Sequence, residues 1–289
     1  MNKLFGMMCF LVPFALQGAS AQDAQVVNPE PITVSMLNDL VDQTNFIVGS
    51  GCSGTLISVE HRLIMTAGHC VDSKISFANE EKVVNGEVTK IKREIRRDVT
   101  VSQKVYRGTT MVGSSTYQAD ILAYSDNRIA YDLALLQVKS ERIPMTLAIP
   151  ILPKGTDAVR GSRVYVVGNP AGLDASITQG IIVSTSRELE ASNGTKTAML
   201  QTDAEVFFGN SGGVLMSDTG FYLGTVSRGI PGTAVIFAVH YKHVQELLTN
   251  ACFGKLWNPD ADDEKCRAKK GNEDGDSVKD ILKKILDKK

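Results

Sequence analysis

A long succession of short strand-like runs separated by turn residues is the feature that most limits how this 289-residue chain folds. The runs begin at Phe46 and end near Val239. Many short strands in two stretches of about 90 to 100 residues are typical of two β-barrels of similar size. Prolines and glycine between Pro144 and Gly155 indicate a crossing between the two. We therefore expect an all-β protein with two barrels.

The first residues of the chain have a different character. Lys3 precedes an apolar run from Leu4 to Leu16, and Ala19-Ser20-Ala21 has the small-x-small pattern of a cleavage site. We predict that residues 1–21 are a secretory signal peptide, too short for a lasting membrane anchor, rather than a core helix. No later stretch approaches the length of a membrane span. We expect a secreted or periplasmic protein without an integral membrane segment.

Both ends of the mature chain differ from its centre. Residues 22–44 form a lead-in with a short helix predicted around 34–42. From Asn258 onward charged residues dominate, so residues 258–289 are expected to be a charged tail. Its last part has the start of a capping box at Ser277 and an apolar helical face. An isolated helix of this length is marginal in water, so fraying or docking on the protein itself is favoured over a contact with a partner or a membrane.

The cysteines indicate disulfides. Once Cys9 has left with the signal peptide, an even number remains: Cys52, Cys70, Cys252 and Cys266. In an exported chain such a set predicts two disulfides, for which three pairings exist. The simplest joins neighbours in sequence, Cys52 to Cys70 and Cys252 to Cys266. Metal binding is the weaker alternative because the chain has no C-x-x-C, and we expect neither a metal nor another cofactor.

The charge of the chain bears on whether it binds nucleic acid. The formal net charge is −1, which gives no reason to expect nucleic acid as a partner. Residues 82–107 are rich in lysine and arginine, as in a basic recognition patch. Acidic residues are interspersed at Glu87, Glu94 and Asp98, so a solvated hairpin is the favoured interpretation.

A glycine-rich turn at Gly209-Asn210-Ser211-Gly212-Gly213 carries the main functional signal. Glycines let the backbone turn tightly and a substrate approach, and two N–H groups on such a turn can face a developing oxyanion. His69 follows a buried-looking strand and precedes Cys70, as suits a rigidly held general base. Asp132 opens an apolar strand, where an acid needs partners, and an imidazole is one such partner.

These three regions resemble the signature blocks of the trypsin-like (chymotrypsin-fold) serine proteases. The blocks are Leu63-Ile64-Met65-Thr66-Ala67-Gly68-His69-Cys70, Tyr131-Asp132-Leu133-Ala134-Leu135-Leu136 and Gly209-Asn210-Ser211-Gly212-Gly213. The HtrA/Deg branch is the most similar, because Gly168-Asn169-Pro170-Ala171-Gly172-Leu173, Thr178-Gln179-Gly180-Ile181-Ile182-Val183 and Gln201-Thr202-Asp203-Ala204 resemble its segments. The resemblance covers roughly residues 46–250.

The resemblance implies a protease domain over residues 45–257. It would contain two six-stranded antiparallel barrels, over about 45–142 and about 155–250, followed by a short C-terminal helix. The resemblance also implies the roles of the site residues. The catalytic residues would be Ser211 as nucleophile, His69 as proton carrier and Asp132 as the residue that orients His69. The N–H groups of Gly209 and Ser211 would form the oxyanion hole. Substrate would bind along Ser227, Arg228 and Gly229, with Ser227 also contacting Asp132.

The chain departs from the family pattern in two places. Asn210 stands where digestive enzymes have an aspartate that captures a freed N-terminus, so that activation switch is not expected. About 40 residues follow residue 250, where the resemblance ends, and we expect them to be too few for the PDZ domain usual in HtrA/Deg proteins. Specificity has two interpretations. Glu205, six residues before Ser211, would select lysine or arginine if it lined the pocket floor. The resemblance to the HtrA branch instead implies a small apolar pocket for valine, alanine or similar residues, and this interpretation is favoured.

The leading hypothesis is an exported serine endopeptidase that acts on protein or peptide substrates without a cofactor. A first alternative is a catalytically silent binding module on the protease fold, which engages a protein partner through residues 82–107 or the C-terminal helix. A second is a structural or assembly role through the tail.

Overall fold

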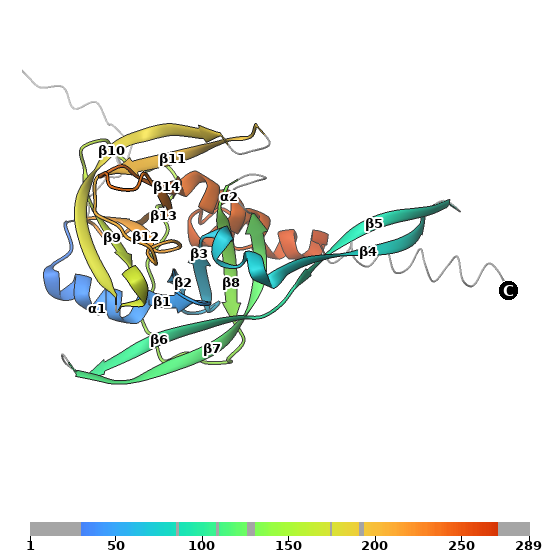
Figure 1. Ribbon diagram of the computed structural model, residues 1–289, viewed down its shortest axis with the longest axis horizontal. Coiled ribbons are helices and arrows are strands. Elements are labelled where there is room, and N and C mark those ends of the chain that lie inside the picture. Colours follow the sequence, from blue (N-terminus) through green and yellow to red (C-terminus); the bar gives the residue numbers. More distant parts are fainter. Residues whose placement is uncertain are drawn as a thin grey trace, which may run out of the picture. The chain divides into compact units, whose positions relative to one another are not determined.

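The computed structural model describes residues 30–84, 87–107, 110–125, 131–173, 175–190 and 194–270 (Figure 1). The predicted signal peptide and the predicted helix near the end of the tail lie outside these residues. Two closed barrels of six strands each dominate the described part of the chain. All strand neighbours in both barrels are antiparallel, which confirms the predicted fold class.

The first barrel closes in the order β1-β2-β3-β8-β7-β6. Its strands are β1 (Asn45–Val48), β2 (Cys52–Ser58), β3 (Leu63–Thr66), β6 (Val99–Arg107), β7 (Thr110–Ser125) and β8 (Leu133–Val138). Apolar side chains such as Phe46, Leu56 and Leu136 are fully buried inside it. Burial of such side chains stabilises the barrel by about 1.5 to 3 kcal/mol each.

The second barrel closes in the order β10-β11-β14-β13-β12-β9. Its strands are β9 (Arg163–Gly168), β10 (Ser176–Glu190), β11 (Lys196–Thr202), β12 (Val214–Ser217), β13 (Tyr222–Gly229) and β14 (Ile236–His240). Its core includes the buried Val166, Leu200 and Leu215. One further core cluster contains residues of both barrels, among them Leu135 and Val214, so the two barrels share apolar packing.

Two α-helices flank the barrels in sequence. The first, α1 (Val34–Thr44), starts at the predicted residue, and the Thr33 hydroxyl caps it by accepting the Met36 N–H at 3.2 Å. The second, α2 (Tyr241–Asn250), follows β14, and residues 263–270 are also helical. Four short 3₁₀ turns complete the described elements: Gly68–Cys70, Asp72–Lys74, Pro170–Gly172 and Gly254–Leu256. No helix within the described ranges is long and apolar enough to cross a membrane.

The lysine- and arginine-rich stretch 82–107 contributes to two different sheets. Its first part belongs to a separate two-stranded sheet of β4 (Ile75–Val84) and β5 (Glu87–Arg96), and its second part is β6 of the barrel (Figure 1). In the two-stranded sheet Arg93 lies 3.0 Å from Glu80, and both side chains are exposed. Such exposed pairs contribute roughly 0 to 1 kcal/mol. The exposed pair agrees with a solvated surface, but the prediction of one hairpin over 82–107 is wrong, because β5 pairs with β4 and β6 pairs with β1 and β7.

Candidate active site

His69 and Asp132 meet because β3 and β8 are antiparallel neighbours. Thr66 pairs with Ala134, so the turn after β3 lies beside the residue that precedes β8. His69 sits in this turn and Asp132 directly before β8. Gly68 allows the close approach, since a side chain there would start 2.3 Å from the Ser125 carbonyl oxygen.

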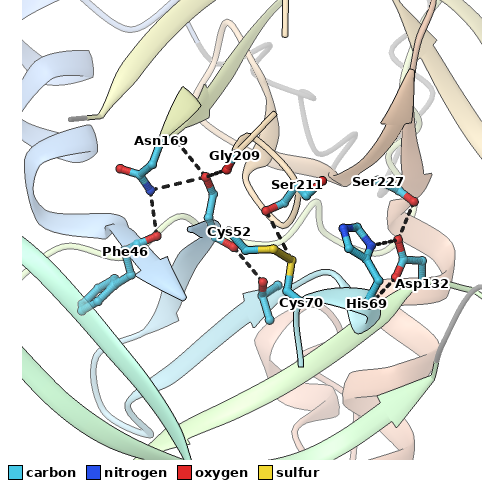
Figure 2. Close-up of a disulfide and its surroundings, with 11 residues drawn as sticks. Phe46, Cys52, His69, Cys70, Asp132, Asn169, Gly209, Ser211 and Ser227 are labelled. Atoms are coloured by element: carbon cyan, nitrogen blue, oxygen red, sulfur yellow. Dashed lines mark hydrogen bonds and ion pairs between the residues drawn. A yellow bond between two sulfur atoms is a disulfide. The ribbon is translucent and has the colours of Figure 1, made fainter. Parts of the chain in front are cut away.

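Asp132 accepts three hydrogen bonds in a buried position. Its Oδ2 lies 2.7 Å from His69 Nδ1 and accepts the Ser227 hydroxyl at 2.6 Å, while its Oδ1 accepts the His69 backbone N–H at 2.8 Å. Figure 2 shows Asp132 between His69 and Ser227. The carboxylate is 1% exposed, and a buried charge of this kind is tolerated when donors surround it.

The pKa values of the pair diverge. The hydrogen bond to Asp132 raises the pKa of His69 above its ordinary value of 6.5, although partial burial of the ring opposes this. Burial alone would raise the pKa of Asp132, but the hydrogen bond and charge of His69 outweigh it and hold that pKa below 3.8. The pair therefore combines an ionised carboxylate with a basic imidazole, as a general base requires.

Ser211 and His69 line one cavity of about 500 Å³. No hydrogen bond joins the two side chains in the described part of the chain. Such bonds are often long before substrate binds and shorten in the complex. The structure thus brings all three predicted catalytic residues to one place, where barrel one supplies His69 and Asp132 and barrel two supplies Ser211.

Ser53 of β2 holds the turn that carries Ser211. Its backbone N–H donates to the Ser211 carbonyl at 2.7 Å, and its hydroxyl donates to the Gly209 carbonyl at 2.6 Å. Its own carbonyl accepts the Thr66 hydroxyl at 2.7 Å, which fixes Ser53 within barrel one. A strand of barrel one therefore sets the position of the nucleophile turn of barrel two. Sequence analysis missed this residue.

Asn169 completes the contact between the barrels. Its backbone N–H donates to the Ser53 hydroxyl at 2.7 Å, and its side-chain amide donates to the Phe46 carbonyl at 2.9 Å. Asn45 donates to the Asn169 side-chain oxygen at 2.7 Å. Gly209 has a φ of 103° and passes Asn169 so closely that a side chain would start 2.3 Å from its carbonyl oxygen. Glycine is therefore required at 209.

Both predicted disulfides are present in the structure. Cys52 is bonded to Cys70, and Cys252 is bonded to Cys266. The first lies at the site, because Cys70 Sγ is 3.6 Å from the Ser211 carbonyl oxygen. Cys52, Cys70 and His69 place their ligand atoms within 4.8 Å of one another, but the two sulfurs are bonded to each other and are not free to bind a metal.

The cavity beside Ser211 is mainly apolar. Its lining includes the following hydrophobic residues: Val206, Phe207, Phe208, Val226, Ile230, Pro231 and Ile236. Ser227, Arg228 and Gly229 of β13 also line it, as the resemblance implies. Glu205 is exposed and lines a second cavity of about 450 Å³ that contains neither Ser211 nor His69. The structure thus does not bring Glu205 into the cavity of the candidate triad.

Two six-stranded barrels with an Asp-His pair and a serine where they meet define the class of chymotrypsin-fold serine proteases. Residues 52–224 match the family model of the trypsin-like peptidase domain. This match spans more than half of the chain, which therefore belongs to the trypsin-like peptidase family.

Individual relatives agree with the family. The chain is 35% identical over 113 residues to the magnetosome formation protease MamE of Paramagnetospirillum magneticum, covering 39% of this chain and 15% of MamE. It is 28% identical over 255 residues to mitochondrial serine protease HTRA2 of Drosophila sechellia, covering 84% of this chain and 57% of HTRA2. The chain thus spans less than two thirds of either relative.

A solved structure has a similar fold. The serine endoprotease from Yersinia pestis superposes with a TM-score of 0.51 at 20% identity, covering 74% of this chain and 65% of that chain.

Proposed function

We propose that the protein is an exported serine endopeptidase that hydrolyses peptide bonds in protein substrates through a Ser-His-Asp triad. The observation that carries the proposal is the buried Asp132 carboxylate 2.7 Å from His69 Nδ1, with Ser211 and His69 on the same cavity. A serine becomes a nucleophile when a neighbouring base removes its proton and a third group orients that base.

The reaction follows from these positions. Ser211 Oγ attacks the substrate carbonyl carbon while His69 takes the hydroxyl proton, and Asp132 stabilises the imidazolium. The oxyanion that forms accepts hydrogen bonds from the N–H groups of Gly209 and Ser211, which Ser53 holds in place through the carbonyls of the same residues. His69 then gives its proton to the leaving amine. Water, activated by His69, hydrolyses the ester and restores Ser211.

An open strand edge supports peptide as the substrate. The pairing between β12 and β13 ends at Val214 and Thr225, whereas β13 continues to Gly229. Beyond Val226, whose backbone bonds to Gly212 and Gly213, no strand of the described chain pairs with Ser227–Gly229 on that side. An extended substrate can add there as a further strand. The apolar walls of the cavity favour an apolar side chain at the scissile bond over lysine or arginine.

Export is proposed from the predicted signal peptide at residues 1–21 and from the two disulfides, which persist in oxidising compartments. The mature chain would begin at Gln22 and act in the periplasm or outside the cell. Its partners are its protein substrates, and the helix proposed near the end of the tail is a candidate contact with the protein itself or with a partner.

Labelling with a fluorophosphonate probe tests the activity. The purified mature protein should be labelled, and Ser211→Ala should abolish labelling while the far-UV spectrum is unchanged. Ser217→Ala, which removes a serine of β12 that does not line the cavity, serves as a matched control and should label normally. Labelling that persists in Ser211→Ala would place the nucleophile elsewhere. Absence of labelling and of peptide hydrolysis in the unmodified protein would favour the silent binding module.

A further inference from the structure

Arg228 is a charged side chain on a cavity wall that is otherwise almost uncharged. It lines the same cavity as His69 and Ser211, directly after the buried Ser227 that donates to Asp132. Among the residues lining this cavity, all of which the structure describes, the only other titratable side chain is His69. The single permanent charge facing this cavity is therefore positive.

Arg228 has no anionic partner of its own. It is exposed, and within the described ranges it forms neither an ion pair within 4.0 Å nor a side-chain hydrogen bond. Glu205, six residues before Ser211, lines the other cavity. A guanidinium offers five N–H donors in a planar fork that fits a carboxylate through two parallel bonds. In this cavity no acidic group of the described chain pairs with those donors.

The position of Arg228 on β13 places it beside the substrate backbone. Arg228 pairs with Phe237 of β14 on one side, while the edge of Ser227–Gly229 that would receive substrate is open. Phe207, Phe208 and Ile230 are large exposed apolar residues on the same cavity. A side chain of the bound peptide next to Arg228 would lie between these apolar groups and the guanidinium, where displaced water strengthens an ion pair.

We infer that Arg228 selects substrates carrying an aspartate or glutamate in the segment that pairs with Ser227–Gly229. The inference rests on the proposed peptidase function and adds a second determinant to the apolar cavity. The preferred peptide thus combines an apolar side chain at the scissile bond with an acidic side chain nearby. Because the pair is partly exposed, its effect is modest, about three- to tenfold in kcat/KM.

An effect on His69 provides an independent readout. The charge of Arg228 lowers the pKa of His69, whereas the hydrogen bond and charge of Asp132 and the charge of Asp72 raise it. A carboxylate bound to Arg228 offsets the positive charge and so raises the pKa of His69. The acid limb of kcat should therefore lie at higher pH for an acidic peptide than for its neutral counterpart. A merely structural role for Arg228 would not produce this difference.

Matched peptides test the selection. A peptide cleaved by the mature protein is varied with glutamate or glutamine at each of four positions on either side of the scissile bond, and kcat/KM is measured at low and high NaCl. At one position we expect a glutamate-to-glutamine ratio of about three to ten that falls with salt. Arg228→Gln should bring the ratio to about one, and Arg228→Glu should make lysine preferred there. Arg163→Gln removes an exposed arginine that does not line the cavity, and it should keep the ratio.

A ratio of one at every position in the unmodified protein would overturn the inference, as would an unchanged ratio in Arg228→Gln. Fluorophosphonate labelling of each variant shows that its site is assembled. A protein that labels and hydrolyses peptides without an acidic preference contradicts only the role of Arg228, whereas a protein that does neither contradicts the proposed function.

Discussion

At the scale of single residues, Asp132 shows how the surroundings decide what a carboxylate does. It is buried, which disfavours its charge, yet hydrogen bonds from His69 and Ser227 hold it ionised. An ionised Asp132 in turn stabilises the protonated form of His69. In the proposed mechanism the neutral imidazole is the base that activates Ser211, so kcat/KM should rise with pH through a midpoint above 6.5, the ordinary pKa of histidine.

Substitution of Asp132 by asparagine tests this coupling. Asparagine keeps the shape of the side chain but removes the charge that stabilises imidazolium, so the pKa of His69 should fall and the acid limb of kcat/KM should move to lower pH. The substitution also favours a tautomer of His69 that is unsuited to act as the base. We therefore expect kcat to drop by about 10⁴-fold, the size of the loss known for the corresponding change in trypsin. An acid limb at unchanged pH in Asp132→Asn would show that another group controls the profile.

Ser53 gives a second test at this scale. Ser53→Ala keeps the backbone bond to Ser211 but removes the bond to Gly209 and leaves the Asn169 N–H without its acceptor. Each such loss costs about 1 to 3 kcal/mol, and we expect lower stability together with a fall in kcat of about tenfold or more at little changed KM.

Ser58→Ala is the matched control, because Ser58 is a buried serine of the same strand that accepts a hydrogen bond from the His61 N–H. It should lower stability without lowering kcat. Equal effects of the two substitutions on kcat would show that Ser53 contributes to stability but has no specific role in positioning the turn that carries Ser211.

The candidate residues were predictable from sequence to different degrees. His69, Asp132 and Ser211 sit in short local blocks whose residue types report their chemistry. Ser53 and Asn169 act only through contacts between the barrels, and no spacing in the sequence reveals those. Glu205 was considered for the pocket floor by counting six residues back from Ser211, but a count along the sequence does not determine which cavity a loop residue lines, and Glu205 lines the second cavity.

At the scale of elements, the two disulfides close loops of similar length but lie in different parts of the protein. Cys52–Cys70 joins β2, which contains Ser53, to the turn that contains His69. Cys252–Cys266 joins the chain after α2 to the helical residues 263–270. The sequence separations of 18 and 14 residues are close, so each bond should contribute about 3 kcal/mol to stability.

Alanine pairs separate stability from activity. Cys52→Ala with Cys70→Ala and Cys252→Ala with Cys266→Ala should lower the free energy of unfolding by similar amounts in urea titrations. Only the first pair should also lower kcat, because only that disulfide holds both the general base and the strand that fixes the nucleophile turn. If the second pair lowers kcat as strongly at a temperature where both variants are folded, the first disulfide has no special link to the site.

The positions of the helices and strands were more predictable than the pairing of the strands into sheets. The start of α1 and the strand-rich character of both barrels follow from local patterns. The stretch 82–107 was expected to form one hairpin, whereas β5 pairs with β4 outside the barrels and β6 closes barrel one. Both strands have a similar alternating composition and each pairs with a neighbour in sequence, β5 with β4 and β6 with β7. What distinguishes them is the second partner of β6, the distant strand β1, which local patterns do not reveal.

At the scale of the whole molecule, the fold was predictable because a resemblance over most of the chain determines topology, whereas composition alone indicated only two barrels. The docking of the barrels makes the candidate site: Asp132 and His69 belong to one barrel, Ser211 and Gly209 to the other, and Ser53 and Asn169 join them. Neither barrel contains a complete site by itself.

Refolding experiments test this dependence. Trp257 is the only tryptophan, and it donates to the hydroxyl of Thr249 in α2, so its fluorescence reports the folding of the region after barrel two. When the denatured protein with intact disulfides refolds, peptide hydrolysis should return together with the fluorescence change or later. Hydrolysis that returns ahead of the fluorescence would mean that the site assembles before the region after barrel two has folded.

In the proposed enzyme, the bond from Ser53 to the turn that carries Ser211 would make activity depend on the docking of the two barrels. During synthesis β2 is made about 150 residues before Gly209, so Ser53 is already present when the turn at Gly209 is made. An incomplete chain that ends before Gly209 lacks the turn altogether. A newly made chain would be harmless to the cell that produces it until both barrels have closed on each other. In the proposed enzyme, proteolysis would therefore begin only after both barrels have folded.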